Sequence, residues 1–272
     1  MSLPPRKPET ETGFTGYRNM NESHRHAMQK MNCGFSLIEM AIVLFIVALL
    51  LGGLLPTVSS QMEQQHRSET RKQLDNIQQA LIGFAMLNGR LPCPASLASS
   101  GVESNFTGGG DCTDFFNGYV PAVTLGLTPV NDKGLVLDGW NNPIHYAVTN
   151  KNIGLATNAF TSPNGMKTAT LNSLATATPL LVVCSSATSI TATTCGTSAK
   201  LTDNAPALVY SLGKNGGSIS TEADELANTN GTNINGDIVF VNHDQTPTFD
   251  DLVVWISPNI LINKMVSAGK LP

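Results

Sequence analysis

Residues 33–58 read CGFSLIEMAIVLFIVALLLGGLLPTV, and Glu39 is the only charged residue in this stretch. An α-helix rises about 1.5 Å per residue, so the run from Phe35 to Val58 is long enough to cross a bilayer core of about 30 Å. The sequence therefore predicts a membrane-spanning helix over residues 35–58.

The polar segment before this run, residues 1–34, has a net charge of +2. Its five basic residues outnumber its three acidic ones; they are Arg6, Lys7, Arg18, Arg25 and Lys30 against Glu9, Glu11 and Glu22. Because positive flanking charge is retained on the cytoplasmic side, we expect the N-terminus to stay cytoplasmic and the rest of the chain to cross the membrane.

Three interpretations compete for the apolar run. A cleaved secretory signal has an apolar region of about 7–15 residues that ends at a small-x-small site, whereas this run is longer and continues into a helical pattern. A plain signal anchor leaves Glu39 unexplained, because an unpaired carboxylate inside a membrane costs a few kcal/mol. The third interpretation supplies a partner: cleavage after Gly34 would create a positively charged amino terminus at Phe35, about one helical turn from Glu39.

The segment Cys33-Gly34-Phe35-Ser36-Leu37-Ile38-Glu39-Met40, followed by the apolar run, closely resembles the class III signal of type IV prepilins and type II secretion pseudopilins. The resemblance implies that a prepilin peptidase cuts after Gly34 and methylates Phe35. It also implies that Glu39 helps to register each incoming subunit in a helical filament.

Two further features bear on this resemblance. Pro56 resembles the helix-loosening proline of the family. Gly52 and Gly53 would lower the helix propensity of the same segment. The 34-residue leader is long for the family, so we expect the natural start to be Met28 or Met31 if it is not Met1.

The resemblance implies a structural subunit of a type IV pilus or pilus-like filament, a minor pilin. Its expected partners are other pilin subunits, the prepilin peptidase and the inner-membrane assembly platform. The protein would cross the inner membrane once, with its head in the periplasm, before entering the filament. The alternatives are a type II secretion pseudopilin and a membrane-tethered periplasmic binding module that never polymerises.

The amino-acid composition argues against some classes of function. Charged residues make up only 13% of the 272-residue chain, and the net charge is −4; soluble domains usually contain about 25% charged residues. No stripe of Lys or Arg appears, so a nucleic-acid partner is not indicated.

Past Pro56 the pattern becomes amphipathic, which predicts that residues 59–90 continue the helix. Apolar residues at spacings of three and four define one helix face, namely Leu74, Ile77, Leu81, Phe84 and Leu87. Asn88-Gly89, followed by Pro92, predicts the end of the helix.

Residues 91–272 are predicted to form a β-rich head. Short apolar runs separated by turn residues predict strands at 135–137, 144–149, 180–184, 207–212, 238–241 and 252–256. The Thr-, Ser- and Asn-rich residues 155–204 are interpreted as a surface insertion containing a hairpin, and a short helix is expected over 258–268 with Ser257 as its N-cap. One helix laid on an antiparallel sheet is an α+β fold, which is also what the pilin resemblance implies.

Cys33 leaves with the leader, so four cysteines remain in the exported chain: Cys93, Cys112, Cys184 and Cys195. An even number in an exported chain predicts disulfides, with three possible connectivities. We favour Cys93–Cys112 and Cys184–Cys195, because each pair brackets a turn-rich loop. Zinc is disfavoured, because there is no C-x-x-C motif and no His near either pair.

Calcium is the one cofactor that the sequence suggests. Tyr210–Gly216 and Phe249–Leu252 resemble two elements that form the calcium site of major pseudopilins. Asp250 and Asp251 would supply carboxylates, with a side-chain oxygen from Asn215 and backbone carbonyls from around Leu212. Asn215 stands where an Asp is usual, and about 35 residues separate the two elements. The alternative is that both aspartates merely open a strand and cap a turn.

No catalytic motif is present. The sequence lacks G-x-S-x-G, P-loop, H-E-x-x-H and G-x-G-x-x-G contexts, so we expect that the protein is not an enzyme.

Overall fold

The computed structural model describes residues 34, 36–105, 110–216, 221–229 and 237–272, and it describes the side chains of all of these except residues 51–59. The chain divides into two compact units, Met1–Gly53 and Leu54–Pro272, which are described separately. The fold is α+β, with an N-terminal helix and an antiparallel sheet.

Helix α1 spans Leu37–Asn88, close to the predicted bounds, and its first part belongs to the first unit. All described side chains from Ser36 to Leu50 are exposed, as illustrated by Leu37 at 93% and Phe45 at 65%. Among the described residues, no helix is both long enough and apolar enough to cross a membrane. The span predicted over residues 35–58 includes Phe35 and side chains that lie outside the described part of the chain, so it stays a prediction.

The second unit begins with the amphipathic part of α1, which buries one face against the head. Leu74, Ile77 and Leu81 are at most 2% exposed, as the spacing predicted. Leu87, however, is 76% exposed. The buried face instead continues through Ile82 and Ala85, because a 3.6-residue period carries position 87 away from the stripe that 74 and 81 define.

A four-stranded antiparallel sheet forms the centre of the second unit. Its strands run in the order β1 (Gly118–Tyr119), β2 (His145–Val148), β5 (Ala207–Ser211) and β7 (Leu252–Trp255). Three of these lie within predicted runs. The predicted strand at 135–137 is absent; Leu137 forms only an isolated bridge to Pro143.

A second, three-stranded sheet was not predicted. It has the order β4 (Lys200–Ala205), β3 (Leu181–Cys184) and β6 (Val239–Val241). Strands β3 and β4 are antiparallel, whereas β3 and β6 are parallel. The chain passes from this sheet directly into the first one at Pro206, between β4 and β5.

The surface position predicted for residues 155–204 was wrong for part of the segment, although much of the loop between Cys184 and Cys195 is exposed as predicted. The expected hairpin exists as β3–β4, but Phe160, Met166 and Leu181 are fully buried. Apolar residues at these positions outweigh the polar composition of the segment, because burial of even a few large side chains fixes a segment in the core.

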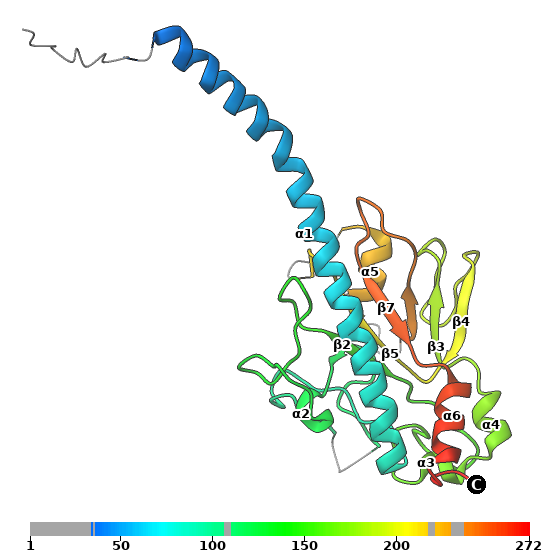
Figure 1. Ribbon diagram of the computed structural model, residues 1–272. Coiled ribbons are helices and arrows are strands. Elements are labelled where there is room, and N and C mark those ends of the chain that lie inside the picture. The colour runs from blue at the N-terminus through cyan, green and yellow to red at the C-terminus, as the bar shows by residue number, and fades with distance from the viewer. Residues whose placement is uncertain (1–33, 35, 106–109, 217–220, 230–236) are drawn as a thin grey trace, which may run out of the picture. The chain divides into compact units, whose positions relative to one another are not determined.

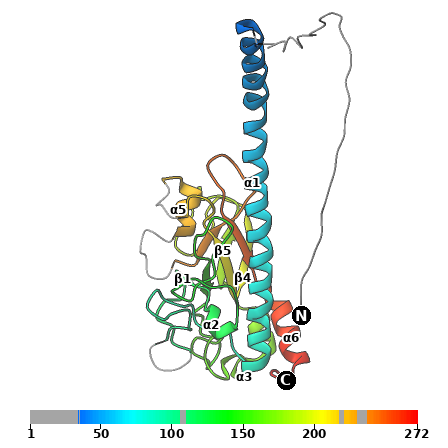
Figure 2. The ribbon, with the colours of Figure 1, turned by 60° about the vertical axis from the view of Figure 1, so that its left-hand side comes forward.

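The four-stranded sheet separates two hydrophobic clusters. One face packs on α1 and on α6 (Pro258–Ser267) through Tyr146, Val148 and Val209; the other face packs on the second sheet through Leu208 and Tyr210. Figures 1 and 2 show α6 beside the C-terminal end of α1. The head therefore has three layers: helix, sheet, sheet.

Short helices complete the second unit: α2 (Ala122–Leu125), α3 (Gly165–Thr168), α4 (Leu171–Ala175) and α5 (Ala223–Thr229). The C-terminal helix α6 begins after Ser257 as predicted, although the Ser257 side chain makes no capping hydrogen bond.

Two disulfides join the pairs that the sequence favoured, Cys93–Cys112 and Cys184–Cys195. The first lies in the cluster under α1 and the second in the cluster between the two sheets. Each closes a short loop, and a closed loop of this length stabilises a fold by about 3 kcal/mol in the chain-entropy account.

Candidate functional site

The N-terminal motif sits at the first turn of α1. Gly34 is exposed, and a Cβ built on it would have no neighbour within 4 Å. Phe35, the predicted methylation site, lies outside the described residues. An exposed glycine without contacts fits a peptide bond that a protease must reach.

Ser36 caps the helix and fixes where it starts. Its carbonyl accepts a hydrogen bond from the Met40 N–H (3.1 Å), and its Oγ accepts one from the Glu39 N–H (3.2 Å). A serine in this role satisfies an amide that has no partner within the helix. The helix therefore begins at Leu37 and places Glu39 in its first turn.

Glu39 is exposed at this helix N-terminus. The partial positive charge of the helix end stabilises an acidic side chain there. In the described residues the carboxylate of Glu39 has no basic partner within the chain.

Gly52, Gly53 and Pro56 lie within the bounds of α1. The loosening expected at these positions remains a prediction.

A second site lies in the head, where three carboxylates meet. Oxygen atoms of Glu225, Asp250 and Asp251 lie within 4.8 Å of one another. Glu225 comes from α5, whereas the two aspartates immediately precede β7. Glu225 and Asp251 are only 3% and 2% exposed. This arrangement concentrates negative charge in a poorly solvated place.

Two of these carboxylate oxygens are buried without a hydrogen-bond partner, Oδ1 of Asp250 and Oδ1 of Asp251. Burial is the main cause that raises the pKa of Asp251 to about 8; the hydrogen bond from Asn228 lowers the pKa, and the charges of Glu225 and Asp250 raise it. Burial also raises the pKa of Asp250. Unpartnered buried carboxylate oxygens are costly unless a proton or a metal cation neutralises them.

These oxygens fit a hard divalent cation. Calcium binds carboxylate and carbonyl oxygens at about 2.3–2.6 Å with a flexible geometry, which several carboxylates within one small volume can provide. Gly213 makes room for the site: its φ is +62°, and a Cβ there would lie 2.0 Å from Oδ1 of Asp250.

Asn215 takes a different part from the one expected. Its Nδ2 donates a hydrogen bond to Oε2 of Glu225 (2.6 Å), so the amide positions a carboxylate rather than presenting an oxygen of its own. The carbonyl of Gly213 accepts hydrogen bonds from Asn142 Nδ2 (2.7 Å) and the Gly216 N–H (3.3 Å). The sequence pattern did not predict Glu225, because only the fold brings α5 to the start of β7.

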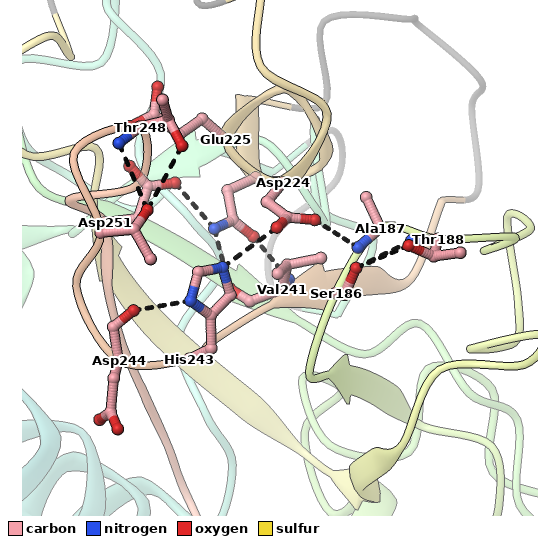
Figure 3. A network of polar contacts seen from close by, with 12 residues as sticks. Ser186, Ala187, Thr188, Asp224, Glu225, Val241, His243, Asp244, Thr248 and Asp251 are labelled. Carbon is pink, nitrogen blue, oxygen red and sulfur yellow. Dashed lines mark hydrogen bonds and ion pairs between the residues drawn. The ribbon is translucent and has the colours of Figure 1, made fainter.

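A polar network extends from α5 on the side away from these carboxylates. Asp224 accepts a hydrogen bond from the Ala187 N–H (2.5 Å) and contacts His243 Nε2 (3.1 Å), as Figure 3 shows. The other ring nitrogen of His243 lies 2.7 Å from the carbonyl of Asp244, and the ring stacks on Phe249. Two adjacent residues of α5 therefore belong to different groups: Asp224 contacts Ala187 and His243, whereas Glu225 belongs to the carboxylate site.

Comparison with known families identifies the N-terminal motif. Residues 29–55 match the model of the prokaryotic N-terminal methylation motif, which is the signature of type IV pilins and pseudopilins. The motif implies processing by prepilin peptidase, assembly with other pilin subunits, and a membrane-anchored, pilus-associated protein. Neither the curated proteins nor the solved structures contain a significant match to the chain.

Proposed function

We propose that this protein is a minor pilin, a structural rather than catalytic subunit of a type IV pilus or pilus-like filament. The observation that supports it is the methylation motif with Glu39 in the first turn of an exposed apolar helix. After cleavage between Gly34 and Phe35, the helix would wait in the inner membrane and then enter a filament core built from such helices.

In that core Glu39 would pair with the amino terminus of a neighbouring subunit. A carboxylate in an apolar environment is strongly disfavoured unless a positive charge neutralises it. The pairing would therefore allow only a subunit in the correct register to add to the filament. A type II secretion pseudopilin would use the same helix and the same pairing in a different assembly.

The Glu39→Val variant tests the pairing. We expect the leader to be removed normally and incorporation into filaments to be lost, measured by immunoblotting sheared filaments against the membrane fraction. Glu69→Val, a change at an exposed glutamate further along α1, is the matched control and should assemble. Normal assembly of Glu39→Val would refute the pairing. Wild-type protein that is processed but absent from every filament would favour the tethered binding module.

We also propose that the head binds a divalent cation of the calcium type through Glu225, Asp250 and Asp251. The two buried carboxylate oxygens without partners support this function. Calcium, when bound, would supply the positive charge that these groups lack. Asn215 and Asn228 would hold two of the carboxylates in place through their amide groups.

Calorimetric titration with calcium chloride tests the cation site. The wild-type protein, freed of metal with a chelator, should bind one calcium ion, and Asp251→Asn should lower the affinity at least about tenfold, because one charged ligand is lost. Asp111→Asn, at an exposed aspartate elsewhere in the head, should bind like the wild type. Equal affinities of the wild type and Asp251→Asn would rule out this site.

A further inference from the structure

Helix α5 links the carboxylate site to a surface loop. We infer that a cation bound at Glu225, Asp250 and Asp251 fixes the loop closed by the Cys184–Cys195 disulfide, and that α5 carries the effect. This inference rests on the proposed cation site and adds a consequence that the site alone does not imply.

The first step is the attachment of α5 to the site. Oε1 of Glu225 accepts a hydrogen bond from the Asp250 N–H (3.2 Å), and Oε2 accepts one from Asn215. These bonds hold Glu225 beside two other carboxylates although like charges repel. A cation between the three groups would turn this repulsion into attraction and draw α5 toward the start of β7.

The second step is the attachment of α5 to the loop. Asp224, the residue before Glu225, accepts the hydrogen bond of the Ala187 N–H, and Ala187 lies within the disulfide loop. Figure 3 shows Asp224 between Ala187 on one side and Glu225 with Asp251 on the other. Asp224 and Glu225 are adjacent in one short helix. A movement of the helix that follows a change at Glu225 would therefore also move Asp224.

The third step is the fixed end of α5. Asn228 is fully buried; its Nδ2 donates to the Val241 carbonyl (2.9 Å) and to Oδ2 of Asp251 (2.8 Å), and its Oδ1 accepts from the Val241 N–H (2.8 Å). The C-terminal turn of α5 is therefore tied to β6. The N-terminal turn, which carries Asp224 and Glu225, is the part whose position the cation would control.

The loop that receives this effect is mostly polar and outward-facing. Thr188, Ser189, Thr191, Thr193 and Thr194 are exposed. Ala187 is its point of attachment to α5, whereas Ala192 is attached separately through its carbonyl to the Ile238 N–H (3.0 Å). Occupancy of the site would thus decide whether the loop presents one conformation or several.

Amide hydrogen exchange of the full chain in detergent tests this coupling. We expect calcium chloride, compared with chelator, to slow exchange of the Ala187 amide at least about tenfold, because its hydrogen bond to Asp224 would open less often. Asp224→Ala should abolish this slowing while calorimetry still detects calcium binding. Asp203→Ala, at a carboxylate on β4 that contacts neither α5 nor the carboxylate site, is the control and should exchange like the wild type.

The outcomes separate the two proposals. If calorimetry shows no binding of calcium by the wild type, the cation site fails and the coupling fails with it. If calcium binds with unchanged exchange at Ala187, the coupling alone is overturned. If Asp224→Ala keeps the full calcium-dependent slowing, the route through Asp224 is wrong.

Discussion

Gly213 affects both the backbone of a turn and the space beside Asp250 in the head. It lies between β5 and the turn that faces Asp250, and its left-handed backbone has a φ of +62°. Glycine adopts this region without cost, whereas other residues lose roughly 1–2 kcal/mol there. The absent side chain also leaves the volume that Oδ1 of Asp250 occupies. One glycine thus serves both the turn and the carboxylate site.

We predict that Gly213→Ala destabilises the head and removes cation binding. The substitution adds backbone strain and a clash, because the new Cβ would lie 2.0 Å from Oδ1 of Asp250. Gly126→Ala is the matched control: its φ of +69° carries similar strain, but a Cβ there would have no neighbour within 4 Å. The free energy of unfolding, measured in urea, should fall by about 1–2 kcal/mol for Gly126→Ala and by more for Gly213→Ala. Equal losses would show that the space beside Asp250 is unimportant.

At the scale of elements, three strands carry a row of rings on one face of the central sheet. Tyr119 on β1 pairs with His145 on β2, which pairs with Tyr210 on β5. The ring centroids are 4.7 Å and 5.0 Å apart, and Tyr210 continues the row to Phe240 of the second sheet, 5.3 Å away. The row therefore joins the two sheets.

The free energy of unfolding should depend on pH because His145, a titratable residue, is part of this row of rings. Burial lowers the pKa of His145 to about 4, from an ordinary value of 6.5. The folded state disfavours the charged imidazole. The contribution of neutral His145 to the free energy of unfolding is therefore complete above pH 6.5, and it is lost as the pH falls from 6.5 toward 4. We expect the urea midpoint to fall over this range in the wild type and to fall less in His145→Gln. An identical pH dependence in both proteins would show that His145 contributes nothing to it.

The strands show which parts of the fold local sequence patterns can predict. Strands β2, β3, β5, β6 and β7 all lie inside predicted runs, because each is a short apolar segment between turn residues. Their division into two sheets was not predicted, because the parallel pairing of β3 with β6 joins residues more than 50 positions apart. Local patterns carry no information about such a pairing.

The same distinction applies to the candidate sites. The N-terminal motif was recognisable from the sequence because its residues are consecutive, and the match over residues 29–55 confirms it. Cleavage after Gly34 and the role of Glu39 stay predictions, and the cap at Ser36 was not predicted. In the head, Asp250 and Asp251 were predicted, but Glu225 was not. A glutamate on a short helix has no local signal that marks it as a neighbour of a distant strand.

At the scale of the whole molecule, the proposed function assigns separate tasks to the two units. The first unit carries the processing motif and an exposed apolar helix. The second unit is a three-layer head with two disulfides, which are typical of proteins in oxidising compartments. In the proposed filament, a low number of charges in the head would limit repulsion between neighbouring subunits.

Intact-protein mass spectrometry and N-terminal sequencing of the protein, expressed with a prepilin peptidase, test this account most directly. We predict a mature chain that lacks residues 1–34 and begins with N-methylated Phe35, and a Gly34→Val variant that keeps its leader. A wild-type chain that retains residues before Phe35, or is cut at another position, would contradict the account.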